Sequence, residues 1–378
     1  MPCAFPARGH LARAIREGPM QSIYQLVAGF RAGDAISNAA LLMRDVFRGW
    51  GCRSEILVQR SSVTADFLDD TLPLEAAEKL GPDDIAVLHL SIGHRINLLF
   101  KELKCRRVIV YHNITPARYF KLLNQAIARD LEEGRRHLKM LADVADLNLA
   151  DSNYNAQELV EAGYGNVKVF PLPINIDSLV RGGTDPKTES DLRGDIRNIL
   201  FVGRIAPNKK LDDLLNVMFY LAKIEPKTRL VHVGSEAGTE MYFAMLQAQV
   251  NALGLRKSSV KFMCGVPQNV LNTCYATADV FLCMSEHEGF CAPLIEAMLH
   301  QVPVLSLASA AIPETLGGAG VLFSPPPDFL MIAETIAEVL HNKTLRDQIV
   351  ARQNKRLDLF RSRDLSADMR ALFAPLLK

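Results

Sequence analysis

The chain has 378 residues, more than one hydrophobic core usually serves, so we first expect two domains. Hydrophobic residues make up 49% and charged residues 22%, a globular composition that argues against wholesale disorder. The net charge of +1 argues against a general nucleic-acid binder, which usually carries a strongly basic domain. No apolar run approaches the roughly 20 residues that span a bilayer, which leaves association with a membrane surface open.

The seven cysteines are scattered and form no C-x-x-C pair, which argues against a disulfide framework and a zinc site and favours a reducing, cytosolic setting. Cys264 and Cys283 lie in apolar runs, so we expect small core residues there. Residues 1–19 are basic and lack the long apolar segment of a secretory signal, so we expect an N-terminal extension. Arg8, Arg13 and Arg16 in this extension are candidates for membrane contact, and the favoured alternative is a disordered tail.

In the first half, short apolar runs alternate with longer amphipathic stretches, which predicts a parallel sheet with helices on both faces. One helix is expected at 35–50, ended by Gly51, and another at 152–163, with Ser152 as its N-cap and Gly163 at its end. The expected strands are IYQLVAGF (23–30), SEILVQ (54–59), IAVLHL (85–90), RVIVYH (107–112) and LNLADS (147–152).

The second half repeats this alternation, and its clearest helix is expected at 210–224. The polar, charged stretch 176–196 predicts a linker between a first domain at 20–175 and a second at 197–355. The expected strands of the second set are NILFVGRI (198–205), RLVHVG (229–234), VKFMCG (260–265), VFLCMS (280–285), VPVLSL (302–307) and GVLF (320–323).

Two doubly wound domains create a cleft, and ligands of such sheets bind beyond the carboxyl ends of the strands. The run FVGRIAPNKK places Gly203, Arg204, Lys209 and Lys210 between a buried strand and a helix. Arginine and lysine side chains beside a helix N-terminus form a site that suits a diphosphate. The alternative is that both lysines are solvated loop residues.

A second loop is SEHEGFCAPLIEAM, in which Pro293 fits the first turn of a helix. Glu288 then lies in the loop, and the amides of residues 289–291 can point at phosphate or sugar oxygens. Glu296 lies in the helix, where its carboxylate is a good acceptor for two vicinal hydroxyls. Alternatively, Glu296 only complements the helix dipole, and Glu288 is an ordinary loop acid.

Three further loops carry candidate residues. His112 follows a buried strand and is aimed at the cleft, where a histidine can hydrogen-bond a sugar hydroxyl. His89, flanked by leucines, is expected to be a satisfied core histidine. Gly33 allows close ligand approach, but its loop lacks G-x-G-x-x-G, which weakens a dehydrogenase hypothesis, and Asp34 can simply cap the next helix. Gly265 follows another strand, where backbone can face a nucleobase.

These motifs, in this order over roughly residues 21–360, resemble the retaining GT-B glycosyltransferases of family four. The most specific likeness is the pair Glu288 and Glu296 in E-G-F-C-A-P-L-I-E-A-M. In the family, the first glutamate lies at the transferred sugar and the second binds the ribose hydroxyls. Its G-R-x-x-x-x-K pattern matches Gly203, Arg204 and Lys209. The chain departs from the family pattern at two positions. The family often has Gly-Gly in its first loop, where this chain has Ala-Gly-Asp, and it often has a second glycine after E-G-F, where this chain has Cys291.

The resemblance implies a GT-B fold of two Rossmann-like domains, with a last helix at 356–378 that packs back on the first. It also implies which residues act in catalysis and in donor binding. The expected catalytic residues are Glu288, His112, Arg204 and Lys209. Expected donor-binding residues are Gly33, Gly203, Arg204, Lys209, Gly265, Val266, Gly289, Phe290, Cys291 and Glu296.

The implied reaction is transfer of a hexose from a nucleoside-diphosphate sugar to a saccharide or lipid-linked saccharide, with retention of configuration. No metal or other cofactor is expected, since no D-x-D occurs in a strand-end loop and cations can stabilise the leaving diphosphate. A likeness to bacterial surface-polysaccharide enzymes favours GDP-mannose over a UDP-sugar and suggests a cytoplasmic enzyme that associates peripherally with the plasma membrane. The alternatives are an epimerase or sugar phosphorylase of the same fold, and a non-catalytic scaffold that binds nucleotide sugars.

Overall fold

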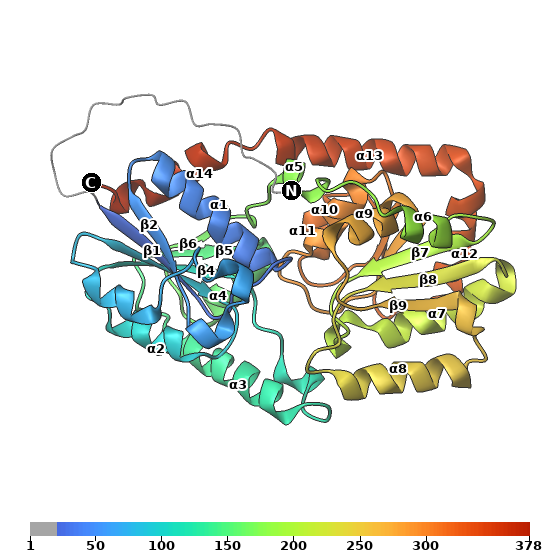
Figure 1. Ribbon diagram of the computed structural model, residues 1–378, viewed down its shortest axis with the longest axis horizontal. Coiled ribbons are helices and arrows are strands. Elements are labelled where there is room, and N and C mark those ends of the chain that lie inside the picture. Colours follow the sequence, from blue (N-terminus) through green and yellow to red (C-terminus); the bar gives the residue numbers. More distant parts are fainter. Residues whose placement is uncertain (1–20) are drawn as a thin grey trace.

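The computed structural model of the protein describes residues 21–378. Two six-stranded parallel sheets lie side by side, each between layers of helices (Figure 1). The expected extension at 1–19, with Arg8, Arg13 and Arg16, lies outside the described residues.

The first sheet has the strand order β2-β1-β3-β4-β5-β6. Successive side chains of a strand point to opposite faces, so Ile23 joins the core on one face and Tyr24 the core on the other. The strands are β1 (Ser22–Val27), β2 (Arg53–Leu57), β3 (Ile85–Leu90), β4 (Arg106–Tyr111), β5 (Leu147–Ala150) and β6 (Val167–Val169). The helices are α1 (Ala35–Gly49), α2 (Arg95–Glu102), α3 (Gln125–Met140) and α4 (Asn153–Glu161).

The second sheet has the order β12-β11-β10-β7-β8-β9, so β7 and β10 are neighbours at its centre. Its strands are β7 (Arg197–Val202), β8 (Thr228–Val233), β9 (Val260–Met263), β10 (Val280–Cys283), β11 (Val304–Leu307) and β12 (Val321–Phe323). Its helices are α7 (Leu211–Ile224), α8 (Glu240–Ala252), α9 (Gln268–Ala276), α10 (Ala292–Leu299), α11 (Ile312–Leu316) and α12 (Phe329–His341).

The polar stretch expected as a linker contains two short helices, α5 (Ile176–Leu179) and α6 (Pro186–Leu192). Asp185 caps α6 by accepting from the amide of Thr188 at 2.8 Å, and Pro186 occupies the first turn. Leu192 is buried in the core of the second domain. This buried side chain fastens α6 to the second sheet, together with hydrogen bonds that Asn198 and Arg229 donate to the carbonyl of Leu192.

The C-terminal helices return the chain to the first domain. The long helix α13 (Lys343–Arg361) runs beside the second domain, and α14 (Leu365–Phe373) lies by α1 (Figure 1). Met369 and Phe373 of α14 are fully buried in a core cluster of the first domain, and the rings of Phe373 and Phe47 lie 5.2 Å apart. Burial of such a ring contributes about 1.5–3 kcal/mol.

Each expected apolar run contains a strand, and the expected caps at Ser152, Gly51 and Gly163 are confirmed. Strand β6 was not expected. Cys283 is buried as expected, whereas the expectation for Cys264 is wrong, because that residue lies just past β9 and is exposed.

No helix among residues 21–378 combines the length and the apolar character needed to cross a membrane.

Candidate functional site

A cleft of about 770 Å³ lies where the carboxyl ends of the two sheets face each other. In each sheet the direction of strand order reverses, between β1 and β3 in the first and between β7 and β10 in the second. Open parallel sheets bind ligands beyond such reversal points. The loops after these strands supply Arg31, His94, Arg204, Lys209, Glu288 and Gly289 to the wall of the cleft.

Lys209 and Glu288 form the central contact of the cleft. Their Nζ and Oε1 atoms lie 2.6 Å apart, and only 9% of the Glu288 side chain is exposed. Burial by itself lowers the pKa of Lys209, but the Glu288 carboxylate, together with the nearby sulfurs of Cys291 and Cys283, outweighs it and the pKa is raised. The two loops are also joined by backbone, because Glu286 N donates to Asn208 O at 2.9 Å. Two residues that sequence analysis assigned to one donor site therefore lie together.

Lys210 does not share this position. Its Nζ lies 2.8 Å from Asp212 and 3.2 Å from Asp213, at the start of α7. Of the two lysines in the motif, Lys209 alone lines the cleft.

Arg204 faces the cleft without an acidic partner in the described part of the chain. Its guanidinium donates to the carbonyl of Ala237 at 3.3 Å. Desolvation by the surrounding loops lowers the pKa of Arg204, and the like charge of Arg31 lowers it further. Two guanidinium groups from opposite domains thus face one space, an arrangement that attracts an anion. Arg31 was missed by sequence analysis, since a lone arginine in a loop is most often a solvated surface residue.

His112 lies in a buried chain of hydrogen bonds. Its Nδ1 lies 2.8 Å from Asp151 Oδ2, and its Nε2 lies 2.8 Å from Nδ1 of His89. His89 Nε2 lies 3.0 Å from Gln25 Oε1, so the expectation of a satisfied core histidine is confirmed. Burial, together with the charge of His112, lowers the pKa of His89 well below its usual value.

The chain of contacts sets the proton positions. Gln25 Oε1 only accepts, so His89 donates from Nε2 and must accept at Nδ1 from His112. One further proton then lies between His112 and Asp151. Burial raises the pKa of Asp151 and outweighs the opposite effect of His112. Both ring nitrogens of His112 are occupied, so its expected hydrogen bond to a sugar hydroxyl requires this chain to rearrange. Asp151 was missed because strands β4 and β5 bring it to His112 from 39 residues away.

Gly289 brings the two domains into close contact. A β-carbon there would lie 2.8 Å from the carbonyl oxygen of His112 and 2.9 Å from the β-carbon of Asn113, closer than real β-carbon contacts. The amides of Gly289 and Phe290 have no acceptor within the described residues, and they precede the N-terminus of α10. These amides are suited to bind an anion there.

The remaining expected donor residues occupy varied positions. Gly33, in the left-handed region at a φ of 71°, lies on the exposed first loop, where Asp34 caps α1 as the alternative had it. Glu296 lies in α10 and accepts a hydrogen bond from Tyr275 at 2.8 Å, and burial raises its pKa. Gly203 directly follows β7. Gly265 and Val266 follow β9 and do not line the cleft, whereas Phe290 and Cys291 are buried.

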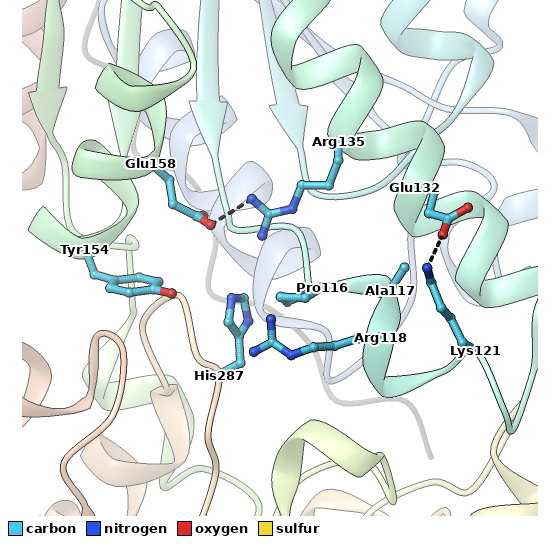
Figure 2. A pocket seen from close by; sticks show the side chains of 9 residues that line it. All are labelled: Pro116, Ala117, Arg118, Lys121, Glu132, Arg135, Tyr154, Glu158 and His287. Carbon is cyan, nitrogen blue, oxygen red and sulfur yellow. Dashed lines mark hydrogen bonds and ion pairs between the residues drawn. The ribbon is translucent and has the colours of Figure 1, made fainter. Parts of the chain in front are cut away.

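A second pocket of about 510 Å³ lies on the other side of His287, and sequence analysis missed it (Figure 2). Lys121 is paired with Glu132 at 3.1 Å, and Arg135 with Glu158 at 2.7 Å. Figure 2 shows Arg118 and the ring of Tyr154 beside His287. Arg118 has no carboxylate partner among the described residues.

His287 forms the wall between the pocket and the cleft and is itself only 5% exposed. Burial, with the positive charges of Arg135, Lys209 and Arg118, lowers its pKa to about 4, so the ring is neutral at pH 7. Its Nε2 is buried without a partner in the described structure. A ligand hydroxyl at this wall would satisfy it.

One cluster among residues 21–378 has the donor atoms for a metal ion, namely Cys283, Glu288 and Cys291. Glu288 already binds the Lys209 ammonium, and a cation placed there would face that charge at close range.

Comparison with known proteins gives a family match in the second domain. Residues 186–356 match the family model of the glycosyl transferases group 1. A D-inositol 3-phosphate glycosyltransferase of Streptosporangium roseum is 26% identical over 75% of this chain and 68% of its own length. O-antigen chain mannosyltransferase B of Escherichia coli is 30% identical over 40% of this chain and 39% of its own length.

Solved structures extend the likeness to both domains. Anabaena HepE in complex with UDP and glucose superposes with a TM-score of 0.74 at 18% identity, over 94% of this chain and all of that one. Sucrose-phosphate synthase from Thermosynechococcus elongatus gives a TM-score of 0.73 at 17% identity, over 94% and 99%. The expected GT-B fold is confirmed.

Proposed function

We propose that this chain, whose residues 186–356 match the group 1 glycosyl transferases, is a hexosyltransferase that uses a nucleoside-diphosphate sugar, retains its anomeric configuration and needs no metal ion. GDP-mannose is the favoured donor, in line with the mannosyltransferase among the relatives. A UDP-sugar is the alternative, in line with the UDP in the HepE structure. The acceptor is a saccharide or lipid-linked saccharide, and in the latter case the enzyme works in the cytoplasm as a peripheral protein of the plasma membrane.

One observation carries the proposal, the set of positive groups around one part of the cleft. Lys209, Arg204 and the free amides before α10 all lie on the second domain, and Lys209 and Arg204 line the cleft. Fixed cations and dipoles aimed at developing charge usually contribute more to catalysis than any other single effect. A departing nucleoside diphosphate develops that charge, and these groups stabilise it in the role a metal ion otherwise has.

Donor binding and the Lys209–Glu288 contact compete for the same ammonium. A diphosphate draws Lys209 toward its oxygens, which frees the buried Glu288 carboxylate from its only cationic partner in the described structure. Glu288 then accepts hydrogen bonds from hydroxyls of the transferred sugar, because an ionised carboxylate is an acceptor with two oxygens. The donor itself thereby rearranges the site for transfer.

Retention follows from attack on the face that the leaving group departs from. The acceptor oxygen bonds to the anomeric carbon as the bond from that carbon to the phosphate oxygen breaks. The departing phosphate oxygen takes the acceptor proton, so no protein nucleophile is required. Closure of the cleft excludes water, which would otherwise accept the sugar.

The pocket beyond His287 suits the acceptor. Tyr154 offers an aromatic face to a sugar ring, and Arg118 offers a guanidinium to a hydroxyl or phosphate. His287 is the residue before Glu288, so an acceptor held there lies at the sugar-binding end of the cleft. We therefore propose that the acceptor binds largely to the first domain.

Product analysis tests the proposed reaction. The purified protein is incubated with GDP-mannose, UDP-glucose or another nucleotide sugar, in EDTA, together with a lipid and oligosaccharide extract. Mass spectrometry should find an acceptor heavier by one hexose, and NMR of the product should give the donor's anomeric configuration. A product of inverted configuration would refute retention. An epimerised donor without transfer would favour the epimerase, and no product from any donor would favour the scaffold.

Arg118→Ala tests the acceptor pocket. The variant should raise the KM for the acceptor about tenfold, the effect of one lost charge-assisted hydrogen bond, and leave the donor Kd unchanged. Arg129→Ala, an exposed arginine on α3 that does not line the pocket, is the matched control. An unchanged acceptor KM in Arg118→Ala would remove this pocket from the proposal.

A further inference from the structure

Cys291 has a backbone conformation that favours glycine. It is the N-cap of α10, with φ at 69° and ψ at 63°, and its side chain makes no capping hydrogen bond. A side chain in the left-handed region costs about 1–2 kcal/mol relative to a glycine. The cysteine neither caps its helix nor relaxes its backbone, so the thiol itself is the feature that remains to be explained.

A second thiol lies next to it. Cys283 is the last residue of β10 and is fully buried, and its Sγ lies 3.4 Å from the hydroxyl of Ser285. The two sulfur atoms and a carboxylate oxygen of Glu288 all lie within 4.8 Å of one another. The cysteine pair therefore lies directly beneath the central contact of the cleft.

The two thiols differ in acidity. The contact with Cys291 lowers the pKa of Cys283, whereas the contact with Cys283, together with burial, raises the pKa of Cys291. The Lys209 ammonium also lies close enough to both sulfurs to interact with their charge. A thiolate beside a cation and a second thiol is the setting in which cysteines are reactive.

We propose that Cys283 and Cys291 are a dithiol that hydrogen peroxide converts to a disulfide, and that this modification disables the cleft. Cys291 is 8% exposed and Cys283 is 0% exposed, so Cys291 is the residue of the pair that peroxide reaches first. The Cys291 sulfur attacks one peroxide oxygen, the O–O bond breaks, and the departing hydroxide takes the Cys291 proton, which leaves a sulfenic acid on Cys291. The Cys283 thiolate then attacks that sulfur and expels a second hydroxide as the S–S bond forms. The two thiol protons and two hydroxides become two water molecules, so peroxide gains the two electrons that the dithiol loses.

Closure of this bond changes the loop between the two cysteines. Sulfur atoms now within 4.8 Å must approach to about 2.05 Å, and Cys283 is fixed in the central strand β10. The start of α10 therefore moves, together with Glu288 and the free amides of Gly289 and Phe290. The loss of donor binding rests on the proposed function, whereas formation of the disulfide does not. A reducing compartment makes such a bond transient, as expected of a redox sensor.

Peptide mapping of the full chain tests the bond. The protein is treated with hydrogen peroxide, blocked with N-ethylmaleimide, and digested with trypsin and a glutamate-specific protease, which cuts at Glu286 and Glu288 between the two cysteines. A disulfide-linked peptide pair should form in the oxidised sample and disappear with dithiothreitol. It should be absent in Cys283→Ala and in Cys291→Gly, and present in the control Cys264→Ala. Separate peptides without a link, after peroxide has been consumed, would overturn the proposal.

Nucleotide binding by the same samples separates this inference from the proposed function. The oxidised wild type should bind the nucleoside diphosphate about tenfold more weakly than the reduced form, whereas Cys291→Gly, which lacks the first sulfur to react, should be insensitive to peroxide. A linked peptide in a protein that never binds nucleotides would contradict the function and keep the dithiol. Stoichiometric zinc that is lost in Cys283→Ala would overturn the dithiol in favour of a metal site.

Discussion

The ammonium of Lys209 lies 2.6 Å from the carboxylate of Glu288 and joins the loop after β7 to the loop after β10. These residues are 79 positions apart in the chain and meet because β7 and β10 are neighbours in the sheet. The same pair connects the proposed diphosphate site with the proposed sugar site. The strength of this ion pair should therefore affect both the binding of the nucleoside diphosphate and the transfer of the sugar.

Replacing Lys209 with alanine should lower transfer by about 10²- to 10³-fold, the usual effect of removing one group that stabilises a developing charge. The variant should also weaken nucleoside-diphosphate binding, measured by calorimetry. Lys210→Ala is the matched control, because Lys210 is paired with Asp212 and Asp213 away from the cleft. Equal effects of the two substitutions would contradict the assignment of Lys209.

Gly289→Ala should separate the domains without unfolding either of them. Its β-carbon would lie 2.8 Å from the His112 carbonyl oxygen, and such overpacking costs about 1–3 kcal/mol. Small-angle scattering should give a larger radius of gyration, and transfer should fall because the cleft no longer closes. Gly49→Ala, where an added β-carbon meets nothing within 4 Å, should leave both quantities unchanged. A compact, fully active Gly289→Ala protein would refute the close contact.

His232 should make the protein less stable in acid. It is fully buried, and burial lowers its pKa to about 4 despite its bond to the Gly203 carbonyl. In the unfolded chain the pKa is about 6.5, so that state binds more protons below pH 6.5. The contribution of neutral His232 to the free energy of unfolding is complete above pH 6.5. As the pH falls toward 4, this free energy decreases by roughly 3 kcal/mol.

Urea denaturation between pH 7 and 4 measures this dependence. His232→Gln keeps a donor for Gly203 and cannot titrate, so its free energy of unfolding should fall less steeply with acid than that of the wild type. Parallel pH curves for the two proteins would show that His232 does not titrate on unfolding.

Asp151 should respond differently to two substitutions. Alanine leaves Nδ1 of His112 buried without a partner, which should lower the free energy of unfolding by about 1–3 kcal/mol. Asparagine can donate its amide N–H to that nitrogen while His112 still donates from Nε2 to His89, so it should recover most of the loss. Urea denaturation of the two variants at pH 7 compares them. Equal destabilisation would argue against the deduced proton positions.

The strands could be predicted because parallel strands buried on both faces form continuous apolar runs. Strand β6 escaped prediction, since Val167–Val169 has only three residues and its centre is the exposed Lys168. Helix α6 escaped because, apart from its leading proline, its only apolar residue is Leu192, which packs on the second domain. Short elements take their stability from tertiary contacts that no local pattern contains.

The site could be predicted one loop at a time. Residues after buried strands were expected at the cleft, and Arg204, Lys209 and Glu288 lie there. Their contacts depend on which strands are neighbours, so the chain from Asp151 through His112 to His89 was not foreseen. The pocket at Tyr154 was missed for the same reason, because it forms only where the two domains meet.

The most direct test of the account is a thermal-shift measurement of the purified protein with nucleoside diphosphates and their sugar conjugates, with magnesium and with EDTA. A ligand that binds only the folded state raises the Tm by mass action. We predict that one nucleotide series raises the Tm equally under both conditions and that Lys209→Ala abolishes the shift. No shift with any member at about a millimolar, or a shift only with magnesium, would contradict a metal-independent nucleotide-sugar site.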